Sequence, residues 1–205
     1  MNLQSQNDIK NHFDRLYQAD VTPWKNHPPE PAFYRFMNIL KTDIPGAKIL
    51  DIGCGDGWIS QKAAKLSFEV WGIDSSETAI NQAKGNAKAN AINGKMHFRT
   101  GDALSLPYQT AFFDALLDRG LFHHILPENR RLYFKNILRV LKKKSYLYLA
   151  VFSYRNPENI GQRFEKNDVV NEFYPFFKIK NYSEDPFEHF APAHLLHFIM
   201  ERKSI

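Results

Sequence analysis

The sequence predicts a doubly wound α/β fold, and three features of the chain support this prediction. Short apolar runs alternate with helical patterns from Lys48 to Phe152. A glycine-rich segment directly follows the first of these runs, and two more strand-like runs stand together near the C-terminus. Alternating strands and helices predict a parallel sheet that is covered by helices on both faces. The last two runs predict a hairpin that ends this sheet.

The individual elements follow from the pattern of apolar residues. Strands are expected at 48–52, 69–73, 96–99, 113–117 and 145–152, where short apolar runs occur. Helices are expected at 58–66 and 76–90, and another begins at Pro127, a residue that is favoured in the first helical turn. The hairpin is expected at 177–182 and 195–201. Lys142, Lys143 and Lys144 are expected in a solvated turn between helix and strand.

The N-terminal part differs from this regular middle. Ile9, Phe13 and Tyr17 form an apolar stripe, and a segment with four prolines leads into a second helix. We therefore expect residues 1–45 to form a helical segment that acts as a lid. Residues 46–205 are expected to form the core that binds the ligand.

Composition excludes several classes of protein. The chain has 205 residues, 43% of them apolar, which is enough for one globular domain. It shows no secretory signal and no apolar run long enough to span a membrane, so we expect a soluble, cytoplasmic protein. The single cysteine, Cys54, excludes an internal disulfide. A net charge of +5 is compatible with an acidic partner, but the basic residues are scattered along the chain.

The glycine-rich segment points to a particular kind of ligand. Gly53, Gly55 and Gly57 are spaced G-x-G-x-G, whereas the dinucleotide fingerprint is G-x-G-x-x-G. Asp51 and Asp56 stand beside them and would repel a pyrophosphate. The same carboxylates suit a ligand that carries an ammonium and a sulfonium. The sequence therefore favours S-adenosylmethionine (SAM) over NAD.

Two further acids follow predicted strands. Asp74 ends the second strand, where a carboxylate can accept both ribose hydroxyls. Asp102 follows the third strand, where an acid can accept from the adenine amino group. Each could instead be a solvated surface residue. Ligands of this fold bind across the carboxyl ends of the strands, so the shared position of the acids favours one site.

Four motifs in this order resemble those of class I SAM-dependent methyltransferases: "LDIGCGDG", "VWGIDSS", "TGDALSLP" and "FFDALLDRGLFHHI". The resemblance covers roughly residues 46–152, and "LKKKSYLYL" departs from the usual Pro-Gly-Gly turn. It implies a Rossmann-like methyltransferase fold, with seven strands of which the last is antiparallel. It also implies SAM as cofactor, S-adenosylhomocysteine as product, and a set of cofactor-binding residues. These are Asp51, Gly53, Cys54, Gly55, Asp56, Gly57, Asp74, Ser75, Asp102 and Ala103.

The segment after the fourth strand should face the methyl group and the acceptor. Asp118 and Arg119 are expected to order the methionyl group, and His123 and His124 are candidate bases or acceptor-positioning residues. Alternatively, one histidine packs locally and the other faces water. We expect no metal site, because adjacent histidine side chains should diverge.

Trp24 is the expected centre of the lid. Its ring face could cover the sulfonium and exclude water, so we include it among the cofactor-binding residues. Alternatively, it pins the N-terminal segment to the core. "NHPPEP" superficially resembles the motif of amino-methyltransferases of DNA bases, but it lacks the following aromatic residue and the preceding strand.

The predicted function is methyl transfer from SAM to a small-molecule acceptor by in-line displacement. Methylation of RNA or protein is an alternative that the basic charge supports, although we do not expect nucleic acid as partner. A SAM-binding regulatory protein without catalysis is another alternative. Acceptor contacts are expected from the N-terminal segment and from "DPFEHFAPAH", residues 185–194.

Overall fold

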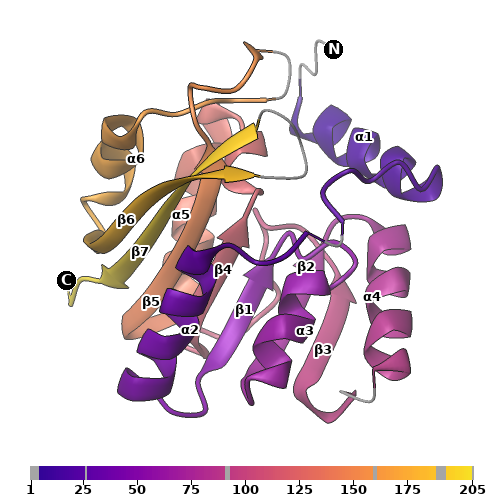
Figure 1. The fold of residues 1–205 in the computed structure, drawn as a ribbon, viewed down its shortest axis with the longest axis horizontal. Helices are drawn as coiled ribbons and strands as arrows, with labels where there is room; N and C mark the ends of the chain where they lie inside the picture. Colours follow the sequence, from indigo (N-terminus) through magenta and orange to yellow (C-terminus); the bar gives the residue numbers. More distant parts are fainter. Residues whose placement is uncertain (1–4, 26, 91–92, 159–160, 188–192, 205) are drawn as a thin grey trace.

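A seven-stranded sheet forms the centre of the protein, with the strand order β3-β2-β1-β4-β5-β7-β6 (Figure 1). The computed structural model describes residues 5–25, 27–90, 93–158, 161–187 and 193–204. The strands are β1 (Lys48–Ile52), β2 (Glu69–Asp74), β3 (Met96–Thr100), β4 (Phe113–Arg119), β5 (Leu141–Phe152), β6 (Phe177–Phe187) and β7 (Ala193–Arg202). β1 to β5 pair in parallel, and β7 is antiparallel to both β5 and β6. The predicted fold class is confirmed.

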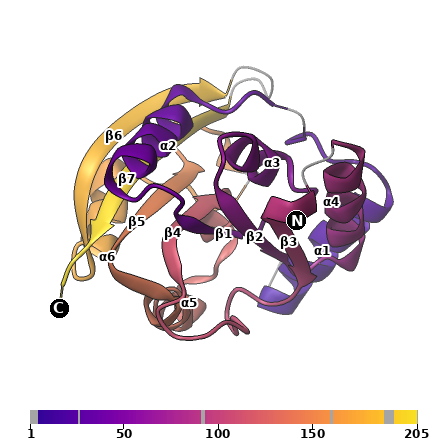
Figure 2. The same ribbon diagram turned by 90° about the horizontal axis from the view of Figure 1, so that it is seen from below.

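Helices cover both faces of the sheet (Figure 2). α2 (Pro31–Asp43), α3 (Trp58–Lys65) and α4 (Glu77–Ala89) lie on one face, and α5 (Pro127–Val140) and α6 (Lys166–Phe173) lie on the other. α1 (Gln6–Gln18) belongs to neither layer and lies beyond the carboxyl ends of the strands, beside α4. None of the described helices is both long and apolar enough to cross a membrane.

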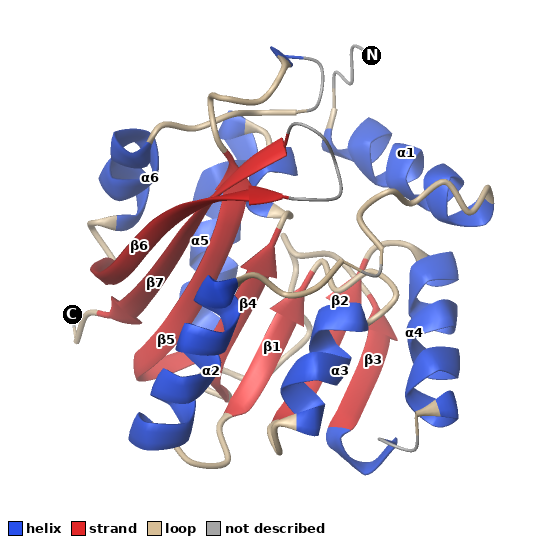
Figure 3. Cartoon of the chain, viewed as in Figure 1, coloured by secondary structure: helices blue, strands red, loops and turns tan. Residues whose placement is uncertain are grey.

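The strand order creates the place where a ligand can bind. β1 pairs with β2 on one side and with β4 on the other, so the chain reverses its direction of winding at β1. At such a switch point the loops after neighbouring strands separate and leave a crevice. The loops after β1, β2, β3 and β4 all open at this edge (Figure 3).

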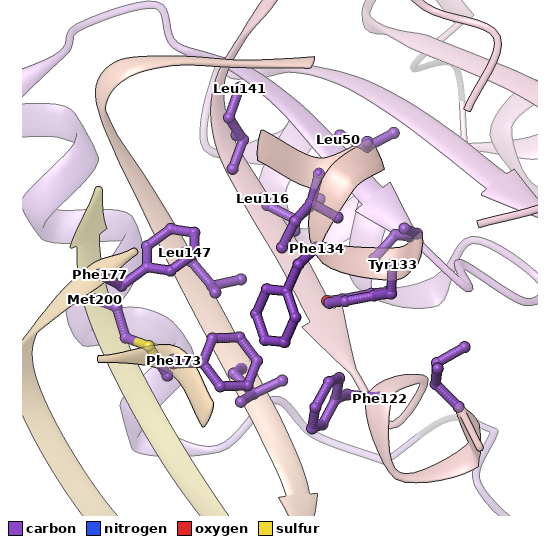
Figure 4. Close-up of a cluster of buried hydrophobic side chains, with 14 of the residues drawn as sticks. Leu50, Leu116, Phe122, Tyr133, Phe134, Leu141, Leu147, Phe173, Phe177 and Met200 are labelled. Atoms are coloured by element: carbon purple, nitrogen blue, oxygen red, sulfur yellow. The ribbon is translucent and has the colours of Figure 1, made fainter. Parts of the chain in front are cut away.

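A cluster of aromatic side chains fixes the segment after β4. Phe122 is fully buried in the core layer beneath α5 and α6, with its ring centroid 5.0 Å from that of Phe173 (Figure 4). Phe134 lies 4.9 Å from Phe173 on the same measure. Burying one such side chain stabilises the fold by about 1.5–3 kcal/mol. Because Phe122 begins the short 3₁₀ helix Phe122–His124, this packing also positions both histidines.

Two local expectations were wrong. Lys142, Lys143 and Lys144 lie within β5 and not in a turn. Lys144 has a positive φ of 58°, and the pairing of β4 with β5 shifts register here, so an irregularity in the strand lets the exposed lysines point to solvent. The helix α6 was not expected, because its eight residues contribute only two buried apolar side chains, Val169 and Phe173.

Candidate active site

The glycine loop after β1 adopts a conformation that other residues would strain. Gly53, Gly55 and Gly57 all have positive φ, and Gly57 caps α3 in the left-handed region. A Cβ on Gly55 would lie 2.3 Å from the Tyr17 Oη, and one on Gly57 would lie 2.7 Å from a Phe98 ring carbon. The loop is therefore shaped so that its backbone approaches whatever occupies the crevice.

Asp51 stands at the base of this loop and is 3% exposed. Its Oδ2 accepts a hydrogen bond from Ser60 Oγ at 2.5 Å. Burial raises the pKa of Asp51 to about 7, and the neighbouring Asp74 carboxylate adds to this rise. A cation in the crevice would oppose this shift, because it favours the ionised carboxylate.

Asp74 ends β2 and braces the glycine loop. Its Oδ2 accepts from the Gly55 backbone N–H, and its Oδ1 accepts from the Ser76 N–H, both at 2.9 Å. Burial raises its pKa despite these bonds. Ser75, the next residue, is exposed and lines the crevice, while Asp56 accepts from the Trp58 N–H at 3.2 Å. Burial raises the pKa of Asp56 as well.

Asp102 lies after β3 and contacts a residue of α1. Its Oδ2 accepts from Lys10 Nζ at 2.5 Å, and its Oδ1 accepts from the Leu104 N–H at 2.9 Å. Ala103 is half-buried beside it and lines the crevice. The acid expected to meet the adenine thus holds a lysine of the N-terminal helix.

Asp118 and Arg119 have separate roles in the structure. Asp118 is fully buried and accepts from the N–H groups of Leu121 and Phe122 and from Tyr133 Oη, so it organises the turn after β4. Burial raises its pKa to about 6. Arg119 lines the crevice and donates to Glu30, with Nη2 2.6 Å from Oε1.

Glu30 connects the crevice to the sheet behind it. It caps the N-terminus of α2 and is 7% exposed, and the Arg119 guanidinium holds its pKa below the usual range against the effect of burial. Tyr148 Oη lies 3.5 Å from Glu30 Oε2 and 3.0 Å from His197 Nδ1. This buried chain of polar groups fixes Arg119 from below.

His123 is held in one tautomer by the backbone. Its Nδ1 accepts the Phe152 N–H at 3.2 Å, and its ring stacks on that of Phe152 with centroids 3.9 Å apart. Because a backbone N–H only donates, Nδ1 is unprotonated and the neutral ring carries its proton on Nε2. Burial lowers the pKa of His123 well below its usual value.

His124 is half-buried and faces the crevice. Among the described residues, no hydrogen bond reaches either of its ring nitrogens. Burial, with a smaller effect of His12, lowers its pKa to about 4, which keeps the ring neutral at physiological pH. Its centroid is 4.3 Å from that of His123, so the expectation that the two side chains diverge was wrong: the 3₁₀ turn stacks them edge to face. Within the described part of the chain, no cluster of three potential metal ligands occurs.

The helix α1 closes the crevice. Ser5 and Asp8 form a capping box at its start. Gln6 donates to the His124 carbonyl and accepts from the Leu126 N–H, both at 3.0 Å, while Asp14 accepts from Ser76 Oγ at 2.6 Å. Together with Lys10, these contacts attach α1 to both ends of the crevice.

Trp24 follows α1 and lines the crevice. Its indole N–H donates to Tyr17 Oη at 3.0 Å, and its ring lies edge to face with Phe13, with centroids 5.5 Å apart. Burial raises the pKa of Tyr17, so its hydroxyl stays protonated. Trp24 therefore attaches the segment after α1 to this helix and lines the crevice, and its expected place over the sulfonium stays a prediction.

Comparison with known proteins identifies the family. The profile of a family described as a methyltransferase domain matches residues 44–188, which is more than half of the chain. The chain belongs to this family. As a class I SAM-dependent methyltransferase, it uses SAM as its cofactor. The enzyme class and the cofactor agree with the prediction from the sequence.

Relatives of this methyltransferase act on chemically different acceptors. Norajmaline N-methyltransferase from Rauvolfia serpentina is 32% identical over 60% of this chain and 42% of its own length. Probable tRNA methyltransferase 9B from Mus musculus is 29% identical over 78% of this chain and 33% of its own. The chain thus spans less than half the length of either. EEF1A lysine methyltransferase 2 from Homo sapiens is 27% identical over 80% of this chain and 75% of its own.

Solved structures share the fold of the methyltransferase. A 1,6-didemethyltoxoflavin N1-methyltransferase from Burkholderia thailandensis has a TM-score of 0.81 at 19% identity, covering 100% of this chain and 93% of its own. Magnesium protoporphyrin IX methyltransferase from Synechocystis has a TM-score of 0.74 at 15% identity and covers 97% of each chain. The TM-scores establish the shared architecture, and identities this low leave the acceptor open.

The methyltransferase gathers most of the predicted site residues around one crevice. Those that line it are Trp24, Asp51, Gly53, Cys54, Gly55, Asp56, Asp74, Ser75, Asp102, Ala103, Arg119, His123 and His124. Gly57 acts as the cap of α3, and Asp118 lies behind the wall. Residues 188–192, part of the expected acceptor wall, lie outside the described residues.

Sequence reasoning missed several residues of the crevice. Gln6, Lys10, Phe13, Tyr17, Phe152 and Leu195 also line it. Phe13 and Tyr17 were recognised as part of an apolar stripe, and acceptor contacts were expected from the N-terminal segment, but neither residue was named as part of the site. Glu30, which accepts from Arg119 behind the crevice wall, had a local signal in the sequence, since an acid between two prolines marks the start of a helix. Lys10 had none, because its partner Asp102 is remote in sequence.

Proposed function

We propose that this methyltransferase transfers the methyl group of SAM to a small molecule enclosed beneath α1. The observation that carries the proposal is the attachment of α1 to both ends of the crevice. Lys10 binds Asp102 at one end, and Gln6 binds the segment after β4 at the other. An acceptor enclosed there is shielded from water and is limited in size.

In this proposal the residues after β1, β2 and β3 hold SAM. They form the cofactor half of the crevice: Asp51, residues 53–56, Asp74, Ser75, Asp102 and Ala103. The buried Asp51 fits the ammonium, because burial raises its pKa and a cation beside it would favour its ionised form. Asp74 fits the ribose hydroxyls, and Asp102 fits the adenine amino group once Lys10 moves away. SAM supplies an electrophilic methyl group when it is bound.

Asp118 and Arg119, both expected at the methionyl group, have different roles in this proposal. Asp118 is saturated by three donors, so we assign it to holding the turn after β4. Arg119, fixed by Glu30, remains at the surface of the crevice and can order the methionyl end.

The two histidines also differ in role. His123 cannot take a proton on Nδ1 without losing its bond to the Phe152 N–H, so we assign it to positioning through its Nε2–H. His124 is neutral, and no described residue occupies its ring nitrogens, so it can accept a proton from the acceptor. Positioning the acceptor for in-line attack remains the larger share of the chemistry.

The test is turnover of methyl-labelled SAM in a fractionated cell extract, with the products sorted by size. Label in a small metabolite supports the proposal. Label in protein or RNA would promote the second candidate, which the similarity to the lysine and tRNA methyltransferases favours. An Asp74→Ala variant serves as the control, because its weaker binding of SAM should reduce labelling in every fraction. Absence of label with the unchanged protein would leave only SAM binding.

A further inference from the structure

The part of the crevice that lies opposite the cofactor half has its own chemistry. It is formed by α1, by the segment after α1, by the turn after β4, and by the ends of β5 and β7. We call it the acceptor half, and it consists of Phe13, Trp24, His123, His124, Phe152 and Leu195. Its assignment to the acceptor rests on the proposed function, in which Asp51, Asp74 and Asp102 hold SAM.

Aromatic rings dominate this half, and their faces are not consumed by the core. Phe13, Trp24 and Phe152 are all only half-buried, although each lines an internal surface. Phe13 meets His124 edge to face at 4.6 Å between centroids. Phe152 stacks one face on His123, whereas the edge-to-face contacts of Phe13 and Trp24 leave ring faces for a further ring, since aromatic pairs favour offset-stacked and edge-to-face arrangements.

The acceptor half also lacks a charge that a ligand could pair with, as far as the described residues go. Both histidines are kept neutral by burial. Arg119, at its border, forms a salt bridge with Glu30 at 2.6 Å. Lys25, next to Trp24, pairs with Asp20 at 2.9 Å. An ionised acceptor would lose its hydration here and gain no opposite charge from the side chains of the acceptor half, which is costly.

We propose that the acceptor is a neutral, flat aromatic molecule that stacks among Phe13, Trp24 and Phe152. The ring contacts set its shape, and the neutral histidines set its charge. Acidic metabolites, amines that are protonated at neutral pH, and nonplanar aliphatic alcohols do not meet these conditions. The nucleotide of an RNA also does not meet them, since its phosphate finds no cation among the residues of the acceptor half.

Binding of matched probes to the protein loaded with S-adenosylhomocysteine tests this proposal without requiring turnover. The probes are 1-naphthol, its saturated analogue 1-decalol, 1-naphthoate, and 1-naphthylmethylamine, which is cationic at neutral pH. Quenching of tryptophan fluorescence and titration calorimetry report binding. We expect 1-naphthol to bind at least about tenfold more tightly than each of the other three.

Two variants locate the binding. Phe152→Leu and Phe13→Leu should each weaken 1-naphthol binding about tenfold while leaving the affinity for S-adenosylhomocysteine unchanged. Using both variants guards against an indirect effect of Phe152 through His123. Phe176→Leu is the matched control, since Phe176 is also a half-buried ring but packs on Phe134 in the layer of α5 and α6.

The outcomes distinguish a failure of the proposed function from a failure of the aromatic acceptor alone. If S-adenosylhomocysteine does not bind, the proposed function itself fails. If it binds but 1-decalol or a charged probe binds as tightly as 1-naphthol, only the aromatic acceptor is overturned. The same conclusion follows if 1-naphthol binds and neither crevice variant weakens it.

Discussion

The two halves of the crevice solve different physical problems with different residues. The cofactor half is built from loops that directly follow parallel strands, and it carries carboxylates whose pKa values are raised by burial. The acceptor half is assembled from α1, the turn after β4, and the ends of β5 and β7, and it carries neutral rings. One half is prepared for a cation, and the other for a flat uncharged surface.

The two halves therefore differ in how far their side chains can vary. The cofactor half depends on backbone shape, since Gly55 and Gly57 tolerate no side chain and Asp74 braces the loop. The acceptor half depends on side chains that project from α1, the segment after α1, the turn after β4, and the ends of β5 and β7. We expect substitutions there to change the acceptor without disturbing the loop, and the relatives are named for different acceptors.

The largest effect is expected for His124→Gln in the acceptor half. If His124 accepts the proton, this substitution should lower kcat by about 100-fold or more and flatten the acid limb of the pH profile. The Kd for SAM should not change. Steady-state kinetics with the acceptor from the labelling experiment would measure this, with His97→Gln as control, because His97 is exposed on β3. An unaltered pH profile would exclude His124 as the base.

Asp74→Ala tests the cofactor half. Loss of a charged hydrogen bond costs about 1.5–3 kcal/mol, so SAM should bind at least about tenfold more weakly in calorimetry. Asp114→Ala is the matched control, because Asp114 is half-buried too but binds Lys48 N and Lys142 Nζ at the opposite end of the sheet. Equal SAM affinity of the two variants contradicts the assignment of Asp74.

The pH dependence of SAM binding tests Asp51. Its pKa is raised to about 7 in the free protein, so the carboxylate is protonated progressively as the pH falls through this value. The ammonium of SAM binds the ionised form, and affinity should therefore fall about tenfold between about pH 8 and about pH 6. Asp51→Asn should bind weakly at every pH and remove this dependence. A parallel pH curve for Asp51→Asn shows that another group is responsible.

The smallest effect is expected for Lys10→Ala, which joins the two halves through α1. Lys10 pairs with Asp102 while both side chains are partly exposed, so the pair contributes about 0.2–1 kcal/mol. Its removal should free Asp102 and tighten SAM binding by a few-fold, with a weaker dependence on salt. Lys180→Ala, which removes a comparably exposed pair with Glu201 between β6 and β7, should leave affinity unchanged. Weaker binding by Lys10→Ala would mean that Lys10 helps to hold SAM.

The sequence predicted the cofactor half better than the acceptor half for a physical reason. Glycines, acids and strand ends lie within a few residues of each other, so Asp51 and Asp74 were placed without tertiary information. Phe152 and Leu195 come together only when β5 pairs with β7. The interaction of Lys10 with Asp102 joins residues 92 positions apart, and no local pattern signals such a contact.

In the fold, too, the elements with a clear local sequence pattern were predicted better than the others. The strands β1 to β4 were predicted almost to the residue, because each is a short apolar run between clear turn signals. The start of β5 was missed, since three consecutive lysines contradict a buried strand. They are tolerated because an irregularity at this end of β5 leaves Lys143 and Lys144 exposed, while Leu141 and Ser145 beside them stay buried.

The position of β7 has a consequence for synthesis of the chain. β7 is the last described strand, yet it lies between β5 and β6, which are made before it. On the ribosome, β5 therefore presents an unpaired, apolar edge until residues 193–202 emerge, and such edges invite association with other chains. The elements of the cofactor half precede this step, whereas Leu195 arrives with it. The acceptor wall is completed last, so a nascent chain that folds early would recognise the methyl donor before it could select what to methylate.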